Sequence, residues 1–371
     1  MARFALYLAG GGARGAYQAG VLKAVHHITA AKTIPFTMIS GVSVGGINAS
    51  ILAEYADDFA CGISKLESLW SEIHCDQIFS AKNYDLSKSL LRNLSHVFIK
   101  GPQPTHLLDT MPLHKFIRDN IDFEKIKNNI ENNLLETIEI ISHCYETQRT
   151  VSFYQHNKPH FDDWYYPRHI SQRVGMGNEH ILASSALPLF FPTIKIDGEH
   201  YGDGGMGLIS PLRGTLKFKY QHIMVIGTRH LLTINEPEHL HARDIGFAHV
   251  LGSMLNGIFL DNLDRDIELI NRMNEVTRLL SMWRRRSSPW LPVNILHLRP
   301  SADVSKIAQE DYNTMPVLLR MLLNILGAQN HSGDLLSFLL FEKKFTKYLF
   351  ELGYNDTIKS ADEVNKFFNA E

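Results

Sequence analysis

Cysteine is scarce in this sequence, with three residues in 371. Cys61, Cys75 and Cys144 have no metal-ligand spacing, and an odd number of cysteines cannot all pair. The simplest interpretation is a protein without structural disulfides, or one that works in a reducing compartment. The four histidines from residue 156 to residue 180 also lack metal-ligand spacing. The sequence therefore predicts no metal ion and no cofactor.

Long apolar runs and a strong net charge are missing too. No stretch approaches ~20 apolar residues, the length that a membrane-spanning helix needs. The first ten residues (MARFALYLAG) are largely apolar, but the run is too short for a signal peptide and has no cleavage site, so we expect a β-strand there. The formal net charge is −2, which gives no reason to expect nucleic acid as a partner. We expect a location in the cytoplasm or at a membrane surface.

Carboxylates are absent before Glu54. This first segment holds two predicted strand–helix units, with strands at 4–8 and 36–39 and helices at 16–28 and 46–56. Both helices begin beside glycines, so backbone amides and helix N-termini make the region locally positive. Such a region suits an oxyanion or a phosphate group.

The second of these units carries a serine on its turn. Residues 41–46 (GVSVGG) have the form Gly-x-Ser-x-Gly at a predicted strand-to-helix junction. A serine there sits in strained backbone with its hydroxyl lifted clear of the sheet, and Gly41 and Gly45 supply the clearance. The amide of Val44 points to where a tetrahedral oxyanion would form. The pattern predicts that Ser43 is an acyl-transfer nucleophile; the alternative is a glycine-rich turn without chemistry.

The first unit carries a glycine loop, residues 10–15 (GGGARG). Gly10, Gly12 and Gly15 satisfy G-x-G-x-x-G, which dinucleotide-binding folds also use. That fold needs an acidic residue about 20 positions further on, where this chain has its second strand and the serine turn. The Gly-Lys-Ser/Thr of a P-loop is missing as well. Nucleotide binding stays open as an alternative to acyl transfer.

Three blocks in a fixed order resemble the patatin-like phospholipase family: residues 10–17 (GGGARGAY), 41–45 (GVSVG) and 203–205 (DGG). The resemblance implies an α/β fold, a three-layer α/β/α sandwich with a mostly parallel central sheet, a helical cap region and C-terminal helices. It also implies a hydrolase of acyl esters in phospholipids, lysophospholipids or other lipids. The family uses a Ser–Asp dyad without histidine. Plant members carry Asp at the position of Ala9, a difference of little consequence because the oxyanion donors are backbone groups.

The resemblance also implies roles for single residues. Ser43 would be the nucleophile and Asp203 the base, delivered by a hairpin predicted at 193–201. The implied oxyanion hole consists of the amides of Gly11, Gly12 and Ala13, to which the serine turn adds that of Val44. The implied loop supports are Gly10, Arg14 and Gly15, and Arg14 would also help to hold negative charge near the loop. A Ser-His-Asp triad with a histidine after residue 203, or a non-catalytic lipid-binding module, remain alternatives.

The rest of the chain predicts how this site is surrounded. We expect a catalytic domain over 1–230, with a helical excursion at 57–112 that lies over the site as a lid or acyl-chain wall. Residues 231–371 would form a mostly helical part packed on the same core. Further strands are predicted at 135–144, 150–154, 222–228 and 293–299, and helices at 179–186, 312–326 and 333–352. The segment 244–286 is predicted as one very long helix or as two helices with a bend.

Residues 283–290 (WRRRSSPW) combine aromatic and arginine side chains, as interfacial membrane contacts do. The candidate contact residues are Trp283, Arg284, Arg285, Arg286 and Trp290. The alternative is a cationic helix end followed by a proline stop. The expected partners are thus an acyl-ester lipid and, transiently, a membrane surface, with the oligomeric state left unpredicted.

Overall fold

The structure is a computed structural model. It describes residues 2–80, 106–158, 161–230, 247–259, 261–281, 283, 291–325 and 333–370. Residues 81–105 of the predicted excursion lie outside this part of the chain, as do Arg284, Arg285, Arg286 and Trp290 of the predicted membrane contact.

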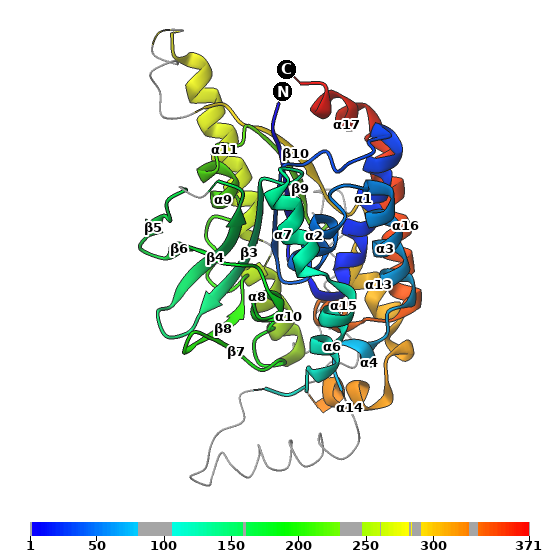
Figure 1. The fold of residues 1–371 in the computed structure, drawn as a ribbon. Coiled ribbons are helices and arrows are strands. Elements are labelled where there is room, and N and C mark those ends of the chain that lie inside the picture. Colours follow the sequence, from blue (N-terminus) through cyan, green and yellow to red (C-terminus); the bar gives the residue numbers. More distant parts are fainter. Residues whose placement is uncertain are drawn as a thin grey trace.

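A mostly parallel sheet forms the middle layer (Figure 1). Its parallel core, in spatial order, consists of β10 (Asn294–Leu298), β9 (His222–Ile226), β1 (Phe4–Leu8), β2 (Met38–Val42) and β3 (Thr137–Cys144). Beyond β3 the sheet continues through β4 (Arg149–His156), β6 (His169–Arg173) and β5 (Tyr165–Tyr166), with β3–β4 and β6–β5 antiparallel. A hairpin of β7 (Ile194–Ile196) and β8 (Glu199–Asp203) joins through β8, which pairs antiparallel with β3.

The central strands are covered on both faces, which explains why the sequence shows apolar runs there rather than alternation. Successive residues of β1 enter two different apolar clusters. Leu6 and Leu8 pack with the helices of one face, whereas Ala5 and Tyr7 pack with Leu263 and its neighbours on the other.

Helices cover both faces of the sheet and make the outer layers (Figure 1). One face carries α1 (Gly15–Thr29), α2 (Val44–Glu54), α3 (Phe59–Glu72), α7 (Phe123–Glu131), α15 (Gly333–Leu339) and α16 (Lys343–Lys359). The opposite face carries α9 (Arg213–Lys217) and α11 (Asp261–Leu279). The other described helices are α4 (Cys75–Ile78), α6 (Met111–Asn120), α8 (Asn178–Ser184), α10 (Phe247–Phe259), α13 (Val304–Glu310), α14 (Val317–Ile325) and α17 (Ala361–Phe368), with short 3-10 turns η1 (Gly12–Arg14) and η2 (Tyr312–Thr314). The predicted three-layer α/β/α fold is therefore present.

The C-terminal helices differ most from their predicted bounds. The segment 244–286, predicted as one long helix or two with a bend, contains two helices, α10 and α11. The helix predicted at 312–326 begins only at Val317, because Pro316 has no amide to continue the preceding η2 turn. The helix predicted at 333–352 is divided into α15 and α16, since Glu342 adopts extended backbone (φ −131°, ψ 136°). Side chains of α15 and α16 share one cluster with those of α1 and α2; the predicted domain boundary near residue 230 stays a prediction.

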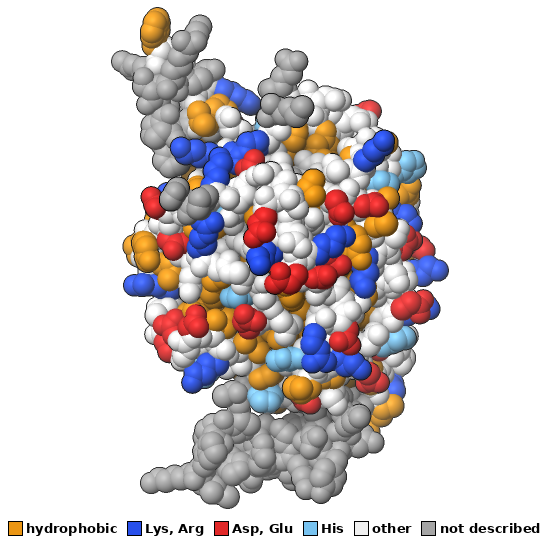
Figure 2. Space-filling model, in the orientation of Figure 1, with side chains coloured by type: hydrophobic (Ala, Val, Ile, Leu, Met, Phe, Trp, Pro, Cys, Tyr) orange, Lys and Arg blue, Asp and Glu red, His pale blue; other side chains and the backbone are white. Residues whose placement is uncertain are grey.

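Acidic and basic side chains are intermixed over the described surface on the face shown in Figure 2. This distribution agrees with the small net charge of the chain. None of the helices in the described ranges combines the length and hydropathy that crossing a bilayer requires.

Candidate active site

Ser43 occupies the turn between β2 and α2 in strained backbone. Its φ of 56° and ψ of −128° lie in a region that costs a residue with a side chain ~1–3 kcal/mol. The sequence permits this turn because small residues flank it. A Cβ on Gly41 would lie 2.4 Å from the Gly45 carbonyl oxygen, and one on Gly45 would lie 2.2 Å from that of Leu8. The helix can therefore start directly against β1 and β2, with Ser43 at the junction.

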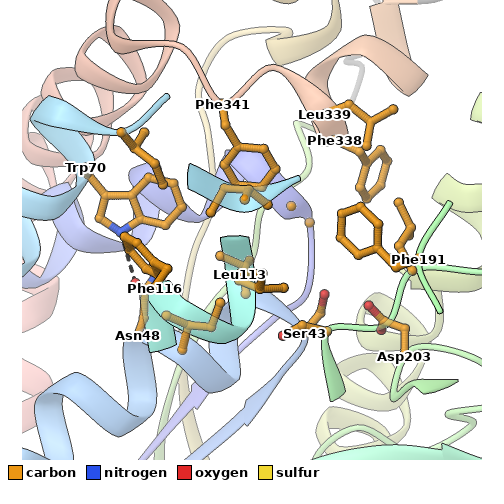
Figure 3. Close-up of a pocket in the computed structure, with 18 of the residues that line it drawn as sticks. Ser43, Asn48, Trp70, Leu113, Phe116, Phe191, Asp203, Phe338, Leu339 and Phe341 are labelled. Carbon is orange, nitrogen blue, oxygen red and sulfur yellow. Dashed lines mark hydrogen bonds between the residues drawn. The ribbon is translucent and has the colours of Figure 1, made fainter. Parts of the chain in front are cut away.

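Asp203 is the last residue of β8 and lies opposite Ser142 of β3. Its carboxyl group is fully buried, and Oδ1 accepts a hydrogen bond from the Gly205 amide at 3.0 Å. The side chains of Ser43 and Asp203 lie next to each other in one pocket (Figure 3). The structure thus brings together two residues that are remote in the sequence.

The environment of Asp203 changes its acidity. Burial raises the pKa of the carboxyl to about 7, while the Ser43 hydroxyl and the Gly205 amide partly oppose this by hydrogen bonding to the charged form. A carboxylate with a pKa near neutrality accepts a proton much more readily than an ordinary aspartate. The site therefore holds a carboxyl that can bind and release a proton near pH 7 beside a hydroxyl.

The two glycines after Asp203 have different structural roles. A Cβ on Gly204 would lie 1.9 Å from the Ile141 carbonyl oxygen and 2.7 Å from the Val42 side chain. Any other residue would push β8 away from β2 and β3. Gly205 supplies the amide that holds the carboxyl. Both contacts keep Asp203 beside the serine turn.

Residues of the glycine loop line the same pocket. Gly12 is the first residue of η1 and Val44 the first of α2, and amides in these positions have no acceptor within their own helix. Gly11, Gly12 and Val44 line the pocket together with Ser43. Ala13 is fully buried and lies outside that lining. The oxyanion hole formed by the amides of Gly11, Gly12, Ala13 and Val44 stays a prediction.

The supporting residues of the loop pack behind it. The Gly10 carbonyl accepts a hydrogen bond from Thr228 Oγ1 at 2.6 Å. A Cβ on Gly15 would lie 2.4 Å from the Val44 side chain, so this glycine lets α1 approach the serine turn closely. Arg14 is buried and donates from Nε to Ser337 Oγ of α15 at 2.8 Å. Its predicted help to a negative charge near the loop stays a prediction.

The pocket encloses about 700 Å³ of space, including the part open to solvent. It extends from Ser43 and Asp203 toward Trp70 and Phe116 (Figure 3). The apolar lining comes from Ile47, Ile51, Leu69, Trp70, Ile73, Ile78, Leu113, Phe116, Leu187, Phe191, Phe338, Leu339 and Phe341. Several of these belong to the described part of the predicted excursion. Such a lining suits a hydrocarbon chain better than a nucleotide.

Among the described residues, two polar side chains besides Ser43 and Asp203 line the pocket, Asn48 and Ser185. The Asn48 amide is already used, because it donates to Gly15 and Gln18 and accepts the Trp70 indole N–H at 3.0 Å. No histidine among the described side chains lines the pocket. His222 packs on the rings of Phe4 and Phe367, and His239 and His241 lie outside the described residues.

The sequence did not single out Phe338, Leu339 and Phe341 as pocket residues. They lie in an apolar stretch near the C-terminus, and helical spacing alone does not distinguish a core side chain from one facing a cavity. Trp283 is described and 82% exposed, but its predicted membrane contact stays a prediction.

A strained serine on a strand-to-helix turn, a buried carboxyl beside it and an apolar pocket lie together in this α/β/α sandwich. The model of the patatin-like phospholipase family matches residues 6–215, more than half of the chain. The chain belongs to this family. Membership in this family supports a lipid hydrolase function for the chain.

Comparison with individual proteins adds little to this assignment. No curated protein matches the chain. Among solved structures, VipD from Legionella pneumophila is similar at 12% identity, with a TM-score of 0.35, over 98% of this chain and 67% of that chain. The structure of full-length ExoU in complex with SpcU, from the type III secretion system of Pseudomonas aeruginosa, is similar at 16% identity, with a TM-score of 0.28, over 91% of this chain and 70% of that chain.

Proposed function

We propose that the chain is a serine-dependent carboxylic ester hydrolase that acts on acyl lipids, with Ser43 as the nucleophile and Asp203 as the base. One observation carries the proposal. The strained Ser43 and a buried carboxyl of pKa about 7 share one end of an apolar pocket. The substrate would be a phospholipid, a lysophospholipid or another acyl ester whose hydrocarbon chain fills the pocket.

In the acylation step, Asp203 accepts the proton of the Ser43 hydroxyl as its oxygen attacks the ester carbonyl carbon. The negative charge that develops on the carbonyl oxygen is held by the amides of Gly12 and Val44, with Gly11 and Ala13 as further predicted donors. Removing one donor in comparable sites costs ~3 kcal/mol of transition-state stabilisation. The alcohol leaves with the proton from Asp203, and the acyl group remains on Ser43.

In the second step, water attacks the acyl-serine carbonyl. Asp203 accepts a proton from the water and returns it to the Ser43 oxygen when the fatty acid leaves. The same amides hold the second oxyanion. One carboxyl group therefore serves both half-reactions, and its raised pKa allows it to bind and release a proton near pH 7.

Covalent labelling by a fluorophosphonate ester tests the proposal. We expect a phosphonyl adduct on Ser43 in the wild-type protein, identified by peptide mass spectrometry, and none in Ser43→Ala. Asp203→Asn should lose hydrolysis of acyl esters. A folded wild-type protein that acquires no adduct would contradict the enzyme assignment and favour a non-catalytic lipid-binding module. A panel of acyl lipids, with products followed by mass spectrometry, would then identify the preferred headgroup and acyl position.

The rival Ser-His-Asp triad has its own test. Single replacement of each histidine after Asp203 by alanine is expected to leave most of the esterase activity. The variants concern His222, His230, His239, His241 and His249. Loss of activity in one folded histidine variant would support the triad.

A further inference from the structure

Ser184, the last residue of α8, contacts the serine turn through a single hydroxyl. Its Oγ accepts a hydrogen bond from the Ser43 amide at 2.9 Å and donates one to the Ile141 carbonyl at 2.5 Å. The residue is completely buried. One side chain therefore joins the turn after β2 to the backbone of β3.

The residues around Ser184 are joined to the segment that carries Asp203. The Gly204 amide donates to the Ser184 carbonyl at 3.3 Å, and the Asp203 amide donates to the Ala186 carbonyl at 3.0 Å. The end of α8 thus contacts both the backbone of Ser43 and the backbone of Asp203. The relative position of these two residues depends on this short segment.

Strained backbone persists only where its surroundings hold it in place. The Ser43 amide points to buried Ser184, and a buried N–H group without an acceptor would be costly. Ser184 supplies the acceptor. Because its own proton is given to the Ile141 carbonyl, its lone pairs remain directed at the Ser43 amide.

We propose that Ser184 is a positioning residue, which holds the Ser43 peptide in the orientation that directs Oγ toward Asp203 and the substrate carbonyl. The inference rests on the proposed function of Ser43. It assigns a role to a hydroxyl whose residue is not part of the pocket lining. Removal of this hydroxyl should change the rate of the chemical steps rather than the binding of the acyl chain.

The test compares Ser184→Ala and Ser184→Cys with Ser50→Ala. Ser50 is an equally buried serine of α2 whose hydroxyl donates to the Gly46 carbonyl at 2.8 Å, which makes it a matched control. Cysteine nearly preserves the volume at position 184 but is a weak hydrogen-bond partner. The readouts are kcat and KM on a p-nitrophenyl ester, the rate of fluorophosphonate labelling, and the pH dependence of kcat/KM.

We expect Ser184→Ala to lower kcat and the labelling rate in parallel, at least about tenfold, with KM within about twofold of wild type. The kcat and labelling rate of Ser184→Cys should lie between those of wild type and Ser184→Ala, and those of Ser50→Ala should equal the wild-type values. The midpoint of the pH profile should move upward in Ser184→Ala, because a displaced Ser43 hydroxyl no longer favours the charged form of Asp203.

Wild-type kcat and labelling rates in folded Ser184→Ala or Ser184→Cys would overturn the inference and leave the proposed function standing. A fall in activity explained entirely by KM would also overturn it. Absence of labelling in the wild-type protein would overturn both proposals.

Discussion

Arg14 lies over the ring of Phe338, with its guanidinium carbon 4.5 Å from the ring centroid. The same guanidinium donates to Ser337 Oγ and lies 3.4 Å from Asp334 Oδ1. The Phe338 carbonyl would lie 2.1 Å from a Cβ on Gly12, so α15 packs directly on the glycine loop. A helix outside the family-matched part of the chain therefore supports the loop that faces Ser43.

Arg14→Lys tests whether this support matters for activity. Lysine keeps the charge but loses the planar group that contacts Ser337, Asp334 and the Phe338 ring together. We expect kcat to fall about tenfold, equivalent to ~1.4 kcal/mol, because the Gly12 amide is held less firmly. KM should change little, since the apolar lining is intact. Steady-state kinetics on an acyl ester gives both values.

Arg3→Lys is the matched control for this variant, because Arg3 also pairs with a carboxylate, that of Glu136, and lies over a ring, that of Tyr220. Arg3 is not among the residues that line the pocket, so its replacement should leave kcat unchanged. Equal kinetics of folded Arg14→Lys and Arg3→Lys would show that the loop does not depend on α15.

The pH dependence of activity should follow Asp203. The carboxyl must be ionised to accept the Ser43 proton, and burial raises its pKa to about 7. We expect kcat/KM to rise about tenfold per pH unit in acid and to level off above about pH 7. An uncharged ester such as p-nitrophenyl butyrate, measured from about pH 5 to about pH 9, reports this ionisation. A plateau that begins near the ordinary pKa of aspartate would contradict a buried carboxylate base.

The same ionisation predicts an effect on stability. A carboxyl whose pKa is higher in the folded than in the unfolded chain binds more protons when folded. Its contribution to stability is therefore complete below its ordinary pKa of 3.8 and is lost as the pH rises through about 7. Ionised Asp203 destabilises the fold, so Asp203→Asn should raise the free energy of unfolding at about pH 8, by up to ~4 kcal/mol. Urea unfolding at about pH 8 and about pH 5 measures the difference, which should shrink in acid.

Asp197→Asn serves as the control for this measurement. Asp197 also precedes a glycine in the same β7–β8 hairpin, but its side chain is exposed. Its replacement should leave the pH dependence of unfolding as in wild type. Parallel stability curves for Asp203→Asn and wild type would mean that burial does not raise the Asp203 pKa.

The first two strand–helix units could be predicted from the sequence because each is local. The strand predicted at 4–8 is β1, and the helix predicted at 46–56 overlaps α2, since short apolar runs next to glycines define both. Long-range relations could not be predicted in this way. That Asp203 lies beside Ser43 depends on the pairing of β8 with β3, and only the family resemblance indicated it.

The break between α15 and α16 shows a second limit. Residues 340–342 contain neither glycine nor proline, and the apolar pattern continues across them. The structure nevertheless turns there, and Phe341 lines the pocket. Strands β5 and β6 are likewise absent from the sequence prediction, because strands of two and five residues give little periodicity.

Trp70 limits the pocket at the end remote from Ser43 (Figure 3). Its indole N–H is fixed by Asn48, and its ring stacks on Phe341 with centroids 6.5 Å apart and an interplanar angle of 15°. If the pocket holds the acyl chain of the substrate, Trp70→Ala should make the pocket longer. We expect the ratio of kcat/KM for a long over a short p-nitrophenyl ester to rise about tenfold, since each added methylene that enters an apolar site gains ~1 kcal/mol.

Two further variants make this last prediction specific. Trp70→Phe keeps most of the ring volume and should shift the chain-length preference less than Trp70→Ala does. It also leaves a usable variant if Trp70→Ala does not fold. Trp164→Ala removes a buried tryptophan that stacks on Tyr154 on the opposite face of the sheet and should leave the preference unchanged. If both Trp70 variants fold and retain the wild-type preference, the chain does not reach Trp70. The acyl group would then have to occupy the space between Ser43 and Phe191, and the apolar wall beyond it would have no part in substrate selection.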